Sequence, residues 1–351
     1  VEEVLEYLDL YHDPEKHSSI KLLYMESISD PRKLLKHASS LVGKGVRIAA
    51  IKAGTTEAGS RAAASHTGAL SSSDSAVRAL FRKAGIVYCN SREELVSVAS
   101  VFNYKELKGR NIAIITHAGG PAVMLADALS SGGLRIPAIE GPDADSLLSL
   151  LHPGSSVANP IDFLATGTAG QLGTIIDYCE HKFEHIDAMV VVFGSPGLFG
   201  VSDVYDVLSQ KLETCSKPIF PVLPSLINAR EEIREFMKRG YINFPDEVVL
   251  GVALVATQNT PAPQALDGPQ HGVDASGIRS IIDSASDGFL SPSEVTALLD
   301  GAGIRRVTEH TITRKSEIDR LAESLEFPVV MKVVGPLHKT DVGGVILDIH
   351  S

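Results

Sequence analysis

The first hundred residues alternate between short apolar runs and longer runs with a helical period. Near-continuous apolar runs at 46–52 and 86–89, and a shorter one at 21–25, predict strands. Helices are expected around them, at 1–11, 31–42, 75–84 and 92–102. Because strands that are apolar on both faces alternate here with helices, the pattern predicts a parallel sheet covered on both sides.

The same alternation restarts after Gly109. A strand over 111–116 leads through a Gly-Gly-Pro turn into a helix that ends near Ser130. Further strands are expected at 135–139, 189–193 and 218–223, and helices near 143–151, 170–182, 203–214, 229–239 and 245–256. The chain therefore predicts an α/β fold with two flavodoxin-like parallel-sheet domains, at 1–106 and 107–257.

The composition changes after the second α/β series. Residues 257–276 are rich in Pro, Gln, Gly and Asp and lack periodicity, so we expect a linker, placed at 258–288. A third unit follows at 289–351, with a helix opened by Ser291-Pro292-Ser293-Glu294, a helix over 313–325 and a strand over 327–334. This unit is short for an enzyme domain, and both chain ends look cut, so we expect a piece of a longer protein.

Composition excludes several classes of partner. The 351 residues include 32 basic and 43 acidic side chains, and the net charge of −11 does not favour nucleic acid or an anionic membrane surface. The longest apolar run, 188–193, is too short to span a bilayer. The three cysteines are widely spaced and form no metal-binding pattern, so reduced, buried thiols in a cytoplasmic protein are expected.

The segment Ile51–Leu70 is the centre of the predicted chemistry. It joins a strand to a helix and contains small residues and three glycines, Gly54, Gly59 and Gly68. Small residues let backbone N–H groups approach an anion, and the N-terminus of the following helix adds positive potential. Its one imidazole, His66, is the group in this core that could act as nucleophile or proton carrier at neutral pH, which favours phosphoryl transfer.

A nucleophilic imidazole needs a carboxylate on its other ring nitrogen to fix the tautomer. Glu57 is close to His66 in sequence, whereas Glu26 follows the strand at 21–25. Glu26 would therefore open onto the same edge of a parallel sheet, which is where α/β sites form. The residues by themselves leave both candidates open.

Four other features carry weaker signals. Thr116–Pro121 is a strand–Gly-Gly–helix turn that lacks the spacing of a dinucleotide fingerprint, and Ala158–Phe163 is a strand end opening into a small-residue loop. Lys332 lies in an apolar strand, so its ammonium must reach a partner such as phosphate or extend to the surface. His338 precedes a Gly-Gly turn and is expected in a loop.

Together these motifs resemble the NDP-forming (ADP-forming) acyl-CoA synthetases, relatives of succinyl-CoA synthetase and ATP-citrate lyase. The resemblance covers almost the whole chain. It rests on motifs that occur in the family's order: Thr55–Gly59, Arg61–Leu70, Thr116–Pro121, Ala158–Asp162 and Leu337–Val345.

The resemblance implies an acid–CoA ligase that interconverts acyl-CoA, ADP and phosphate with a carboxylate, CoA and ATP. An acyl phosphate would transfer its phosphoryl group to His66, which matches the family's phosphohistidine, while Glu26 matches the glutamate that steadies it. His338 matches a second histidine that carries the phosphoryl group, and Lys332 resembles a nucleotide-phosphate lysine. The phosphate would lie at two helix N-termini, held by Gly68, Ala69, Gly119 and Gly120.

The resemblance also makes 289–351 the N-terminal piece of an ATP-grasp domain. The CoA-binding domain that precedes these domains in the family, and most of the ATP-grasp domain, would be missing. Expected partners are a small carboxylic acid, CoA, phosphate and an adenine nucleotide with Mg²⁺. No bound cofactor, metal site, nucleic acid or membrane is expected, whereas homo-oligomerisation, the identity of the acid and the choice between ADP and GDP stay open.

Two other functions compete with the ligase. One is a non-catalytic regulatory module that responds to acyl-CoA or nucleotide, as in relatives fused to acetyltransferase domains; the intact His66 motif favours the enzyme. The other is a flavin- or dinucleotide-binding module, suggested by fold alone. The absence of a G-x-G-x-x-G sequence argues against it.

Overall fold

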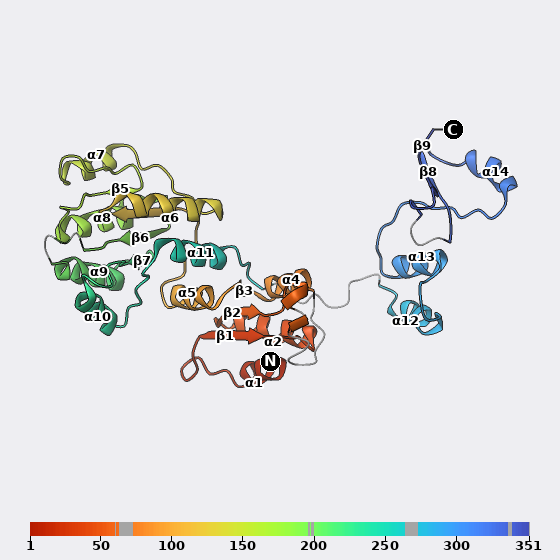
Figure 1. The fold of residues 1–351 in the computed structure, drawn as a ribbon, viewed down its shortest axis with the longest axis horizontal. Coiled ribbons are helices and arrows are strands. Elements are labelled where there is room, and N and C mark those ends of the chain that lie inside the picture. Colours follow the sequence, from red (N-terminus) through yellow and green to blue (C-terminus); the bar gives the residue numbers. More distant parts are fainter. Residues whose placement is uncertain are drawn as a thin grey trace. The chain divides into compact units, whose positions relative to one another are not determined.

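The computed structural model describes residues 1–59, 61–62, 73–195, 197, 200–263, 273–335 and 339–350. The chain forms two compact units, Val1–Ala265 and Leu266–Ser351. Figure 1 labels their helices and strands. Both sheets of the first unit are parallel, which confirms the predicted α/β fold class.

The first sheet has the strand order β1-β2-β3. Its strands are β1 (Ile20–Met25), β2 (Arg47–Lys52) and β3 (Ile86–Cys89), and its described helices are α1 (Glu2–Leu10), α2 (Pro31–Gly43), α4 (Asp74–Ala84) and α5 (Arg92–Phe102). Ile48 and Ala50 of β2 pack in one core with α1, α2 and α4, whereas Ala49 and Ile51 pack in another with α5. Alternate residues of β2 therefore enter different cores, which explains its continuous apolar run.

The helix ends around this sheet follow from short-range chemistry. Asp30 caps α2 by accepting a hydrogen bond from the Lys33 amide at 2.9 Å, and Ser91 caps α5 through the Glu94 amide at 3.1 Å. Gly85 ends α4 at a φ of 74°, a left-handed conformation that glycine adopts without strain.

The second sheet has the strand order β5-β4-β6-β7. Its strands are β4 (Ile112–Thr116), β5 (Ile161–Asp162), β6 (Ala188–Val192) and β7 (Ile219–Val222). The helices that accompany it are α6 (Gly119–Ser131), α7 (Pro142–Ser149), α8 (Ala169–His181), α9 (Ser202–Thr214), α10 (Arg230–Lys238) and α11 (Glu247–Gln258). The chain moves from β4 to one side for β5 and to the other side for β6, so β4 marks a topological switch point.

The two sheets share one hydrophobic core. Residues of β2 and α5 cluster with residues of β4, β6, α6 and α11, and α5 packs directly against α11. Tyr104 strengthens the junction: its ring meets Phe220 edge-on at 5.7 Å, and its hydroxyl accepts a hydrogen bond from the Ile242 amide at 3.0 Å. Both sheets therefore belong to one compact unit.

The sequence-based expectations for the segments 135–139 and 258–288 were wrong in detail. The strand expected at 135–139 is only an isolated bridge between Asn111 and Arg135. Pro137 has no N–H to continue a ladder, and its carbonyl accepts a hydrogen bond from the Asn159 side chain at 2.9 Å instead. The segment expected to be a linker, 258–288, contains a helix, α12 (Ala275–Ser284), whose first turn is capped by Asp274.

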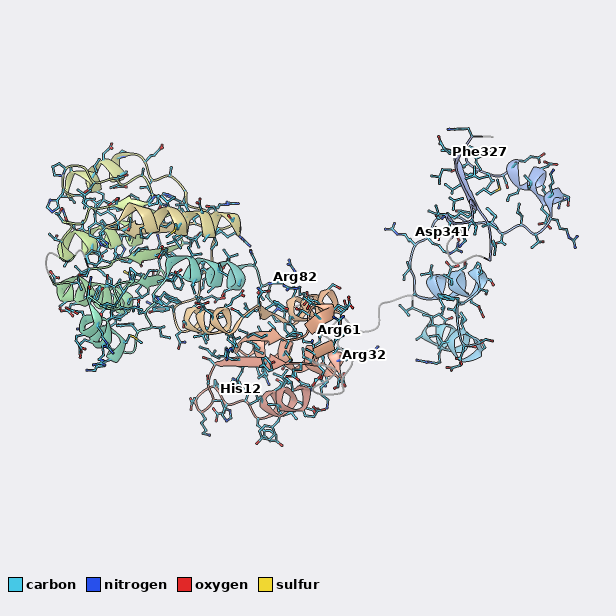
Figure 2. All side chains as sticks on the ribbon, in the orientation of Figure 1. His12, Arg32, Arg61, Arg82, Phe327 and Asp341 are labelled. Atoms are coloured by element: carbon cyan, nitrogen blue, oxygen red, sulfur yellow. The ribbon has the colours of Figure 1, made fainter. Side chains whose placement is uncertain are left out.

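The second unit is small and open. It comprises α12, α13 (Pro292–Gly301), the 3₁₀ turn η1 (Lys315–Glu317), α14 (Ile318–Ala322) and an antiparallel pair, β8 (Val329–Lys332) and β9 (Val345–Ile349). Where a helix was expected over 313–325, the structure has only η1 and α14. None of its described residues is buried, and Phe327, labelled in Figure 2, is 36% exposed.

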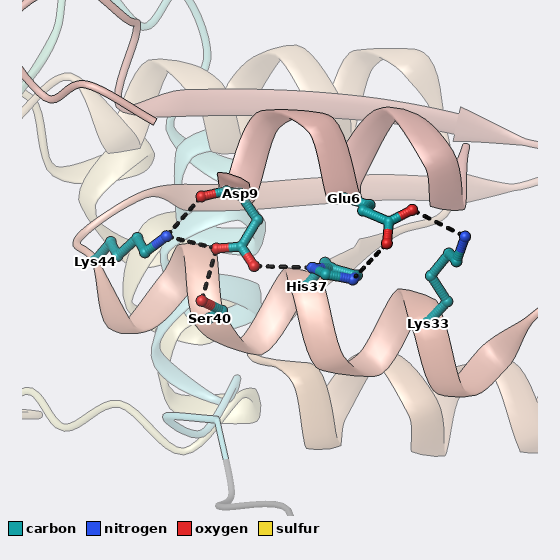
Figure 3. Close-up of polar contacts among 6 residues, drawn as sticks. All are labelled: Glu6, Asp9, Lys33, His37, Ser40 and Lys44. Atoms are coloured by element: carbon teal, nitrogen blue, oxygen red, sulfur yellow. Dashed lines mark hydrogen bonds and ion pairs between the residues drawn. The ribbon is translucent and has the colours of Figure 1, made fainter. Parts of the chain in front are cut away.

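A polar network joins α1 to α2 inside the first unit (Figure 3). The Asp9 carboxylate accepts hydrogen bonds from Ser40 Oγ at 2.6 Å and from Lys44 Nζ at 2.7 Å, and lies 2.8 Å from His37 Nδ1. Burial alone raises the pKa of Asp9, but the hydrogen bonds from Lys44, Ser40 and His37 outweigh it and lower that pKa to about 2. The charged carboxylate is therefore the stable form in the folded protein.

Replacing Asp9 with Asn is expected to destabilise the α1–α2 pair by about 2 kcal/mol at neutral pH, because the lowered pKa measures the stabilisation of the charged form. A lowered folded-state pKa contributes stability above the unfolded value of about 4, and this contribution is lost as pH falls toward 2. Hydrogen exchange of α1 amides at pH 7 and at low pH measures both effects. Asp13→Asn, at a carboxylate that is 34% exposed and paired with Lys16, is the control. Equal protection of α1 in Asp9→Asn and Asp13→Asn at pH 7 would contradict the assignment.

All three cysteines are free and buried, as the sequence predicts. Cys89 lies in the core shared by the two sheets, whereas Cys179 and Cys215 lie in the core on the other face of the second sheet. Burial raises the pKa of the Cys89 and Cys179 thiols to about 12. No helix in the described part of the chain is long and apolar enough to cross a membrane.

Candidate functional site

Half of the predicted site residues can be located. His66, Gly68, Ala69 and His338 lie outside the described residues. The predicted meeting of His66 with Gly119 and Gly120 therefore stays a prediction. The described residues define the sheet edges from which these segments depart.

The carboxyl edge of the first sheet gathers the ends of β1 and β2. Met25 pairs with Lys52 in the parallel register, and the Ala53 amide donates to the Met25 carbonyl at 2.8 Å. Glu26 and Ala53 therefore leave neighbouring strands at the same level. The segment 53–73, which contains His66, starts at this edge and leads into α4. Its starting point beside Glu26 is the one that sequence reasoning expected.

Glu26 is partly exposed, and its carboxylate has one weak contact among the described residues, with the Tyr24 hydroxyl at 3.5 Å. Glu57, the competing carboxylate, is 91% exposed at its side chain and is paired with Arg61 one helical turn away. Figure 2 labels Arg61 on this segment. A carboxylate already engaged by a guanidinium is the poorer candidate for orienting an imidazole, so the geometry favours Glu26.

The first turn of α4 carries one acidic residue, Asp74, which is paired with an arginine. Asp74 accepts hydrogen bonds from Arg78 Nε at 2.7 Å and from the Tyr88 hydroxyl at 3.1 Å. The Arg78 guanidinium also lies 3.9 Å from the centre of the Tyr88 ring. The hydrogen bond from Arg78 is the largest influence lowering the pKa of Asp74. A carboxylate in the first turn partly offsets the positive end of this helix.

Lys52 is the residue at this edge that the sequence analysis missed. Lys52 is the last residue of β2 and is only 3% exposed. Its ammonium donates a hydrogen bond to the Ala53 carbonyl. Burial lowers the pKa of Lys52, while the charges of Asp74 and Glu26 raise it. The sequence carries the same signal at Lys52 as at Lys332, because each lysine lies in an apolar strand.

The second candidate edge lies at the switch point after β4. α6 begins at Gly119, two residues before the Pro121 expected from sequence, and its N-terminus has no side-chain cap. A Cβ on Gly119 would lie 3.7 Å from Asp162 Oδ2, so the carboxylate that follows β5 stands close to this helix end. Uncapped backbone N–H groups at a helix N-terminus are suited to an anion.

His117 lies between β4 and α6. Its ring packs against Phe193 at 4.4 Å, and its Nδ1 lies 3.5 Å from the Val192 carbonyl oxygen. Burial lowers the pKa of His117, against the raising influences of the Val192 carbonyl and Asp162. The neutral imidazole is therefore favoured here.

In the second unit, Lys332 is the last residue of β8 and pairs with Val345 of β9. Its side chain is exposed, so the strand does not bury the ammonium as the apolar run suggested. This position leaves the side chain accessible to a ligand of the unit, and its predicted nucleotide role stays a prediction.

Comparison with known families supports the fold assigned to both units. Residues 1–102 match the model of the succinyl-CoA ligase like flavodoxin domain. Residues 282–351 match that of the ATP-grasp domain.

Known proteins match large parts of the chain. The ADP-forming acetate–CoA ligase I of Archaeoglobus fulgidus is 30% identical over 98% of this chain and 50% of its own length. The alpha subunit of ADP-forming acetate–CoA ligase II of Pyrococcus furiosus is 38% identical over 47% of this chain and 35% of its own. A solved dinucleotide forming acetyl-coenzyme A synthetase 1 of Ca. Korarchaeum cryptofilum, in complex with phosphate and ADP, has a TM-score of 0.65 at 22% identity, covering 73% of this chain and 55% of that one.

These matches show an α/β protein with a part like the succinyl-CoA ligase flavodoxin domain and a part like the ATP-grasp domain. The chain resembles the NDP-forming acyl-CoA synthetases over nearly its whole length. It spans about half the length of the curated relatives that it matches over most of its own length. The predicted resemblance to this family is confirmed, and the named relatives are ligases.

Proposed function

We propose that this chain is part of an NDP-forming acyl-CoA synthetase that works through a phosphohistidine at His66. The supporting observation is the carboxyl edge of the first sheet, where Glu26 stands beside the start of the segment that carries His66. The two relatives named for acetate–CoA ligation with ADP support the reaction class.

The proposed reaction has three steps. Phosphate attacks the acyl-CoA thioester carbon, an acyl phosphate forms and CoA leaves as the thiol. The His66 imidazole then attacks phosphorus, so that a P–N bond forms while the P–O bond breaks and its electron pair leaves on the carboxylate. ADP finally takes the phosphoryl group from His66 and becomes ATP.

Glu26 would hold one ring nitrogen of His66 and thereby leave the other free to attack. The N-termini of α4 and α6, with Gly68, Ala69, Gly119 and Gly120, would supply the backbone N–H groups for the phosphoryl oxygens. His338 would carry the phosphoryl group toward the nucleotide, and Lys332 would contact the nucleotide phosphates. The supporting fact is the ATP-grasp match over the segment that contains both residues.

The substrates follow from this role. They are a carboxylic acid, CoA, phosphate and an adenine nucleotide. The nucleotide would enter as its Mg²⁺ complex, because proteins usually bind Mg²⁺ through one or two carboxylates together with the phosphates of the substrate. The solved relative contains phosphate and ADP, which fits this set. The three buried free thiols support the reducing environment of the cytoplasm.

The proposed layout keeps the domains expected from sequence. A phosphohistidine-bearing domain occupies 1–106 and a second ligase domain occupies 107–257, consistent with one sheet in each. The segment 258–288 would connect them to an ATP-grasp piece at 289–351, with α12 as a helix inside the connection.

Labelling of the full-length protein tests the proposal. Incubation with γ-labelled ATP and Mg²⁺ should place a covalent label on the protein that is labile in acid and stable in alkali, as a phosphoramidate is. Addition of CoA and a suitable acid should discharge it. Failure to label, or acid-stable label on a hydroxyl side chain, would contradict the phosphohistidine route.

Glu26→Gln is expected to slow phosphorylation by roughly 10–100-fold, the range seen when a residue that orients a histidine is lost. Gln cannot stabilise the charge that develops on the imidazole as a carboxylate does. Single-turnover labelling of the full-length protein measures the rate. Glu57→Gln is the matched control, because Glu57 is exposed and paired with Arg61, and its rate should stay near wild type. A larger loss in Glu57→Gln than in Glu26→Gln would reverse the assignment.

A further inference from the structure

Glu247 is a buried carboxylate without a partner among the described residues. It is the first residue of α11 and is 7% exposed. Of the buried polar and charged side chains in the described part of the chain, it is the one that forms neither a hydrogen bond nor an ion pair. The fully enclosed side-chain oxygens that lack a partner there belong to Ser39 and Ser155, so the Glu247 carboxylate keeps a narrow access to solvent. Burying a charge without a partner is costly, so stability does not account for this glutamate.

The helices α6 and α11 pack side by side and run in the same direction (Figure 1). A Cβ on Gly251 of α11 would lie 3.0 Å from the Ala128 Cβ of α6. One turn further along both helices, a Cβ on Gly132 would meet the Val255 side chain. Because the contact points advance together along both chains, the two N-termini lie at the same end of the pair.

This register places Glu247 beside the start of α6. Glu247 lies one helical turn before Gly251, on the side of α11 that faces α6, and Met124 lies one turn before Ala128. Side chains of an α-helix lean toward its N-terminus, so the Glu247 carboxylate leans from the level of Met124 toward that of Gly120. It therefore borders the first turn of α6.

The first turn of α6 has a second carboxylate beside it. Asp162 Oδ2 would lie 3.7 Å from a Cβ on Gly119, and Asp162 Oδ1 accepts a hydrogen bond from the Leu164 amide at 2.9 Å. The uncapped N–H groups of α6 attract an anion, whereas the two carboxylates repel one that is fully ionised. An anion that still carries a proton suits both, because its oxygens accept from N–H groups and its O–H donates to a carboxylate.

We propose that Glu247 is a phosphate ligand that selects the protonated anion at the N-terminus of α6. This inference rests on the proposed function and adds to it a means of choosing inorganic phosphate. Inorganic phosphate keeps an O–H group at neutral pH, and the Glu247 carboxylate accepts the hydrogen bond from it. The O–H bond is not broken: Glu247 holds the phosphate while another of its oxygens attacks the thioester carbon. Asp162 is the weaker candidate, because the Leu164 amide already engages it.

Sulfate is the probe that separates this role from a general one, because it has the size of phosphate but carries no proton at neutral pH. Glu247→Gln in the full-length protein keeps the length of the side chain and adds a donor. In acyl-CoA cleavage, the KM for inorganic phosphate should rise roughly 10–100-fold, as expected for loss of a hydrogen bond to a charged group. The inhibition constant of sulfate against phosphate should fall, because the Gln amide donates to sulfate where the carboxylate repels it.

The opposite changes for phosphate and sulfate exclude simple damage to the site, which would weaken both anions. Glu247→Asp keeps the acceptor on a shorter side chain and should recover part of the preference for phosphate. An unpartnered buried charge weakens the fold, so Glu247→Gln should unfold at the wild-type temperature or higher. Glu231→Gln is the matched control, at an exposed first-turn glutamate of α10 that is paired with Arg234. Neither anion constant should change in it.

The outcomes distinguish the two levels of the inference. If wild type takes up no acid-labile label from γ-labelled ATP, the proposed function fails and the role of Glu247 fails with it. If wild type is labelled but binds sulfate as tightly as phosphate, or if Glu247→Gln keeps the wild-type preference, only the role of Glu247 is overturned. A lower unfolding temperature with an unchanged preference would assign Glu247 to the fold.

Discussion

Replacing His66 with Ala is expected to abolish phosphorylation of the full-length enzyme and leave its fold intact. The imidazole is the group in the segment 51–70 that can attack phosphorus at neutral pH, since the nearby hydroxyls lack an evident activating base. Loss of a residue that forms the covalent intermediate lowers turnover by on the order of 10³-fold or more. The two helix N-termini, each worth up to ~2 kcal/mol to a bound anion, cannot replace the missing nucleophile.

Covalent labelling and acyl-CoA synthesis should both disappear in His66→Ala, while hydrogen exchange of β1, β2 and β3 stays as in wild type. His152→Ala is the control, because His152 is exposed and belongs to none of the motifs. Normal turnover in His66→Ala, or equal loss in His152→Ala, would refute the assigned nucleophile.

Phe220→Ala is expected to lower the free energy of unfolding of the first unit by roughly 3–5 kcal/mol, the usual cost of deleting a buried aromatic side chain. Phe220 is fully buried in the core that β2 and α5 share with β4, β6, α6 and α11. Its ring also meets Tyr104 edge-on. Because the core is shared, the loss should weaken both sheets together.

Hydrogen exchange followed by mass spectrometry can test this coupling, with peptides from β2 and from β6 read in the same sample. Protection should fall in both. Phe289→Ala, at a side chain that is 84% exposed in the second unit, should leave both unchanged. Protection lost in β6 but kept in β2 would show that the two sheets unfold separately.

Periodicity predicted most elements of the first unit because each strand and helix buries its own regular face. The failures have local or long-range causes. Pro137 ended a predicted strand by lacking a donor, and the Asp274 cap gave α12 a start inside a segment judged by composition alone.

The candidate site was predictable only in part. Glu26 follows a strand in the sequence, so the rule that parallel strands end at one edge predicted its place at the sheet edge. The start of a helix at Gly119 was predicted from the strand–Gly-Gly–helix turn, and the roles of both residues stay predictions. Lys52 was overlooked because its exceptional feature is burial, which depends on α2 and α4 packing over β2. The packing of α5 against α11 likewise joins residues far apart in the chain, and no local pattern encodes it.

The reactivity of the buried thiols can also report when the cores of the first unit open. A thiol with a pKa near 12 holds almost no thiolate at neutral pH, so alkylating reagents react with it only after the surrounding core has opened. Cys89 is held in the core between the two sheets and Cys179 in the core on the far face of the second. The alkylation rate of Cys89 therefore reports the opening of the core between the two sheets. The alkylation rate of Cys179 reports the opening of the core on the far face of the second sheet.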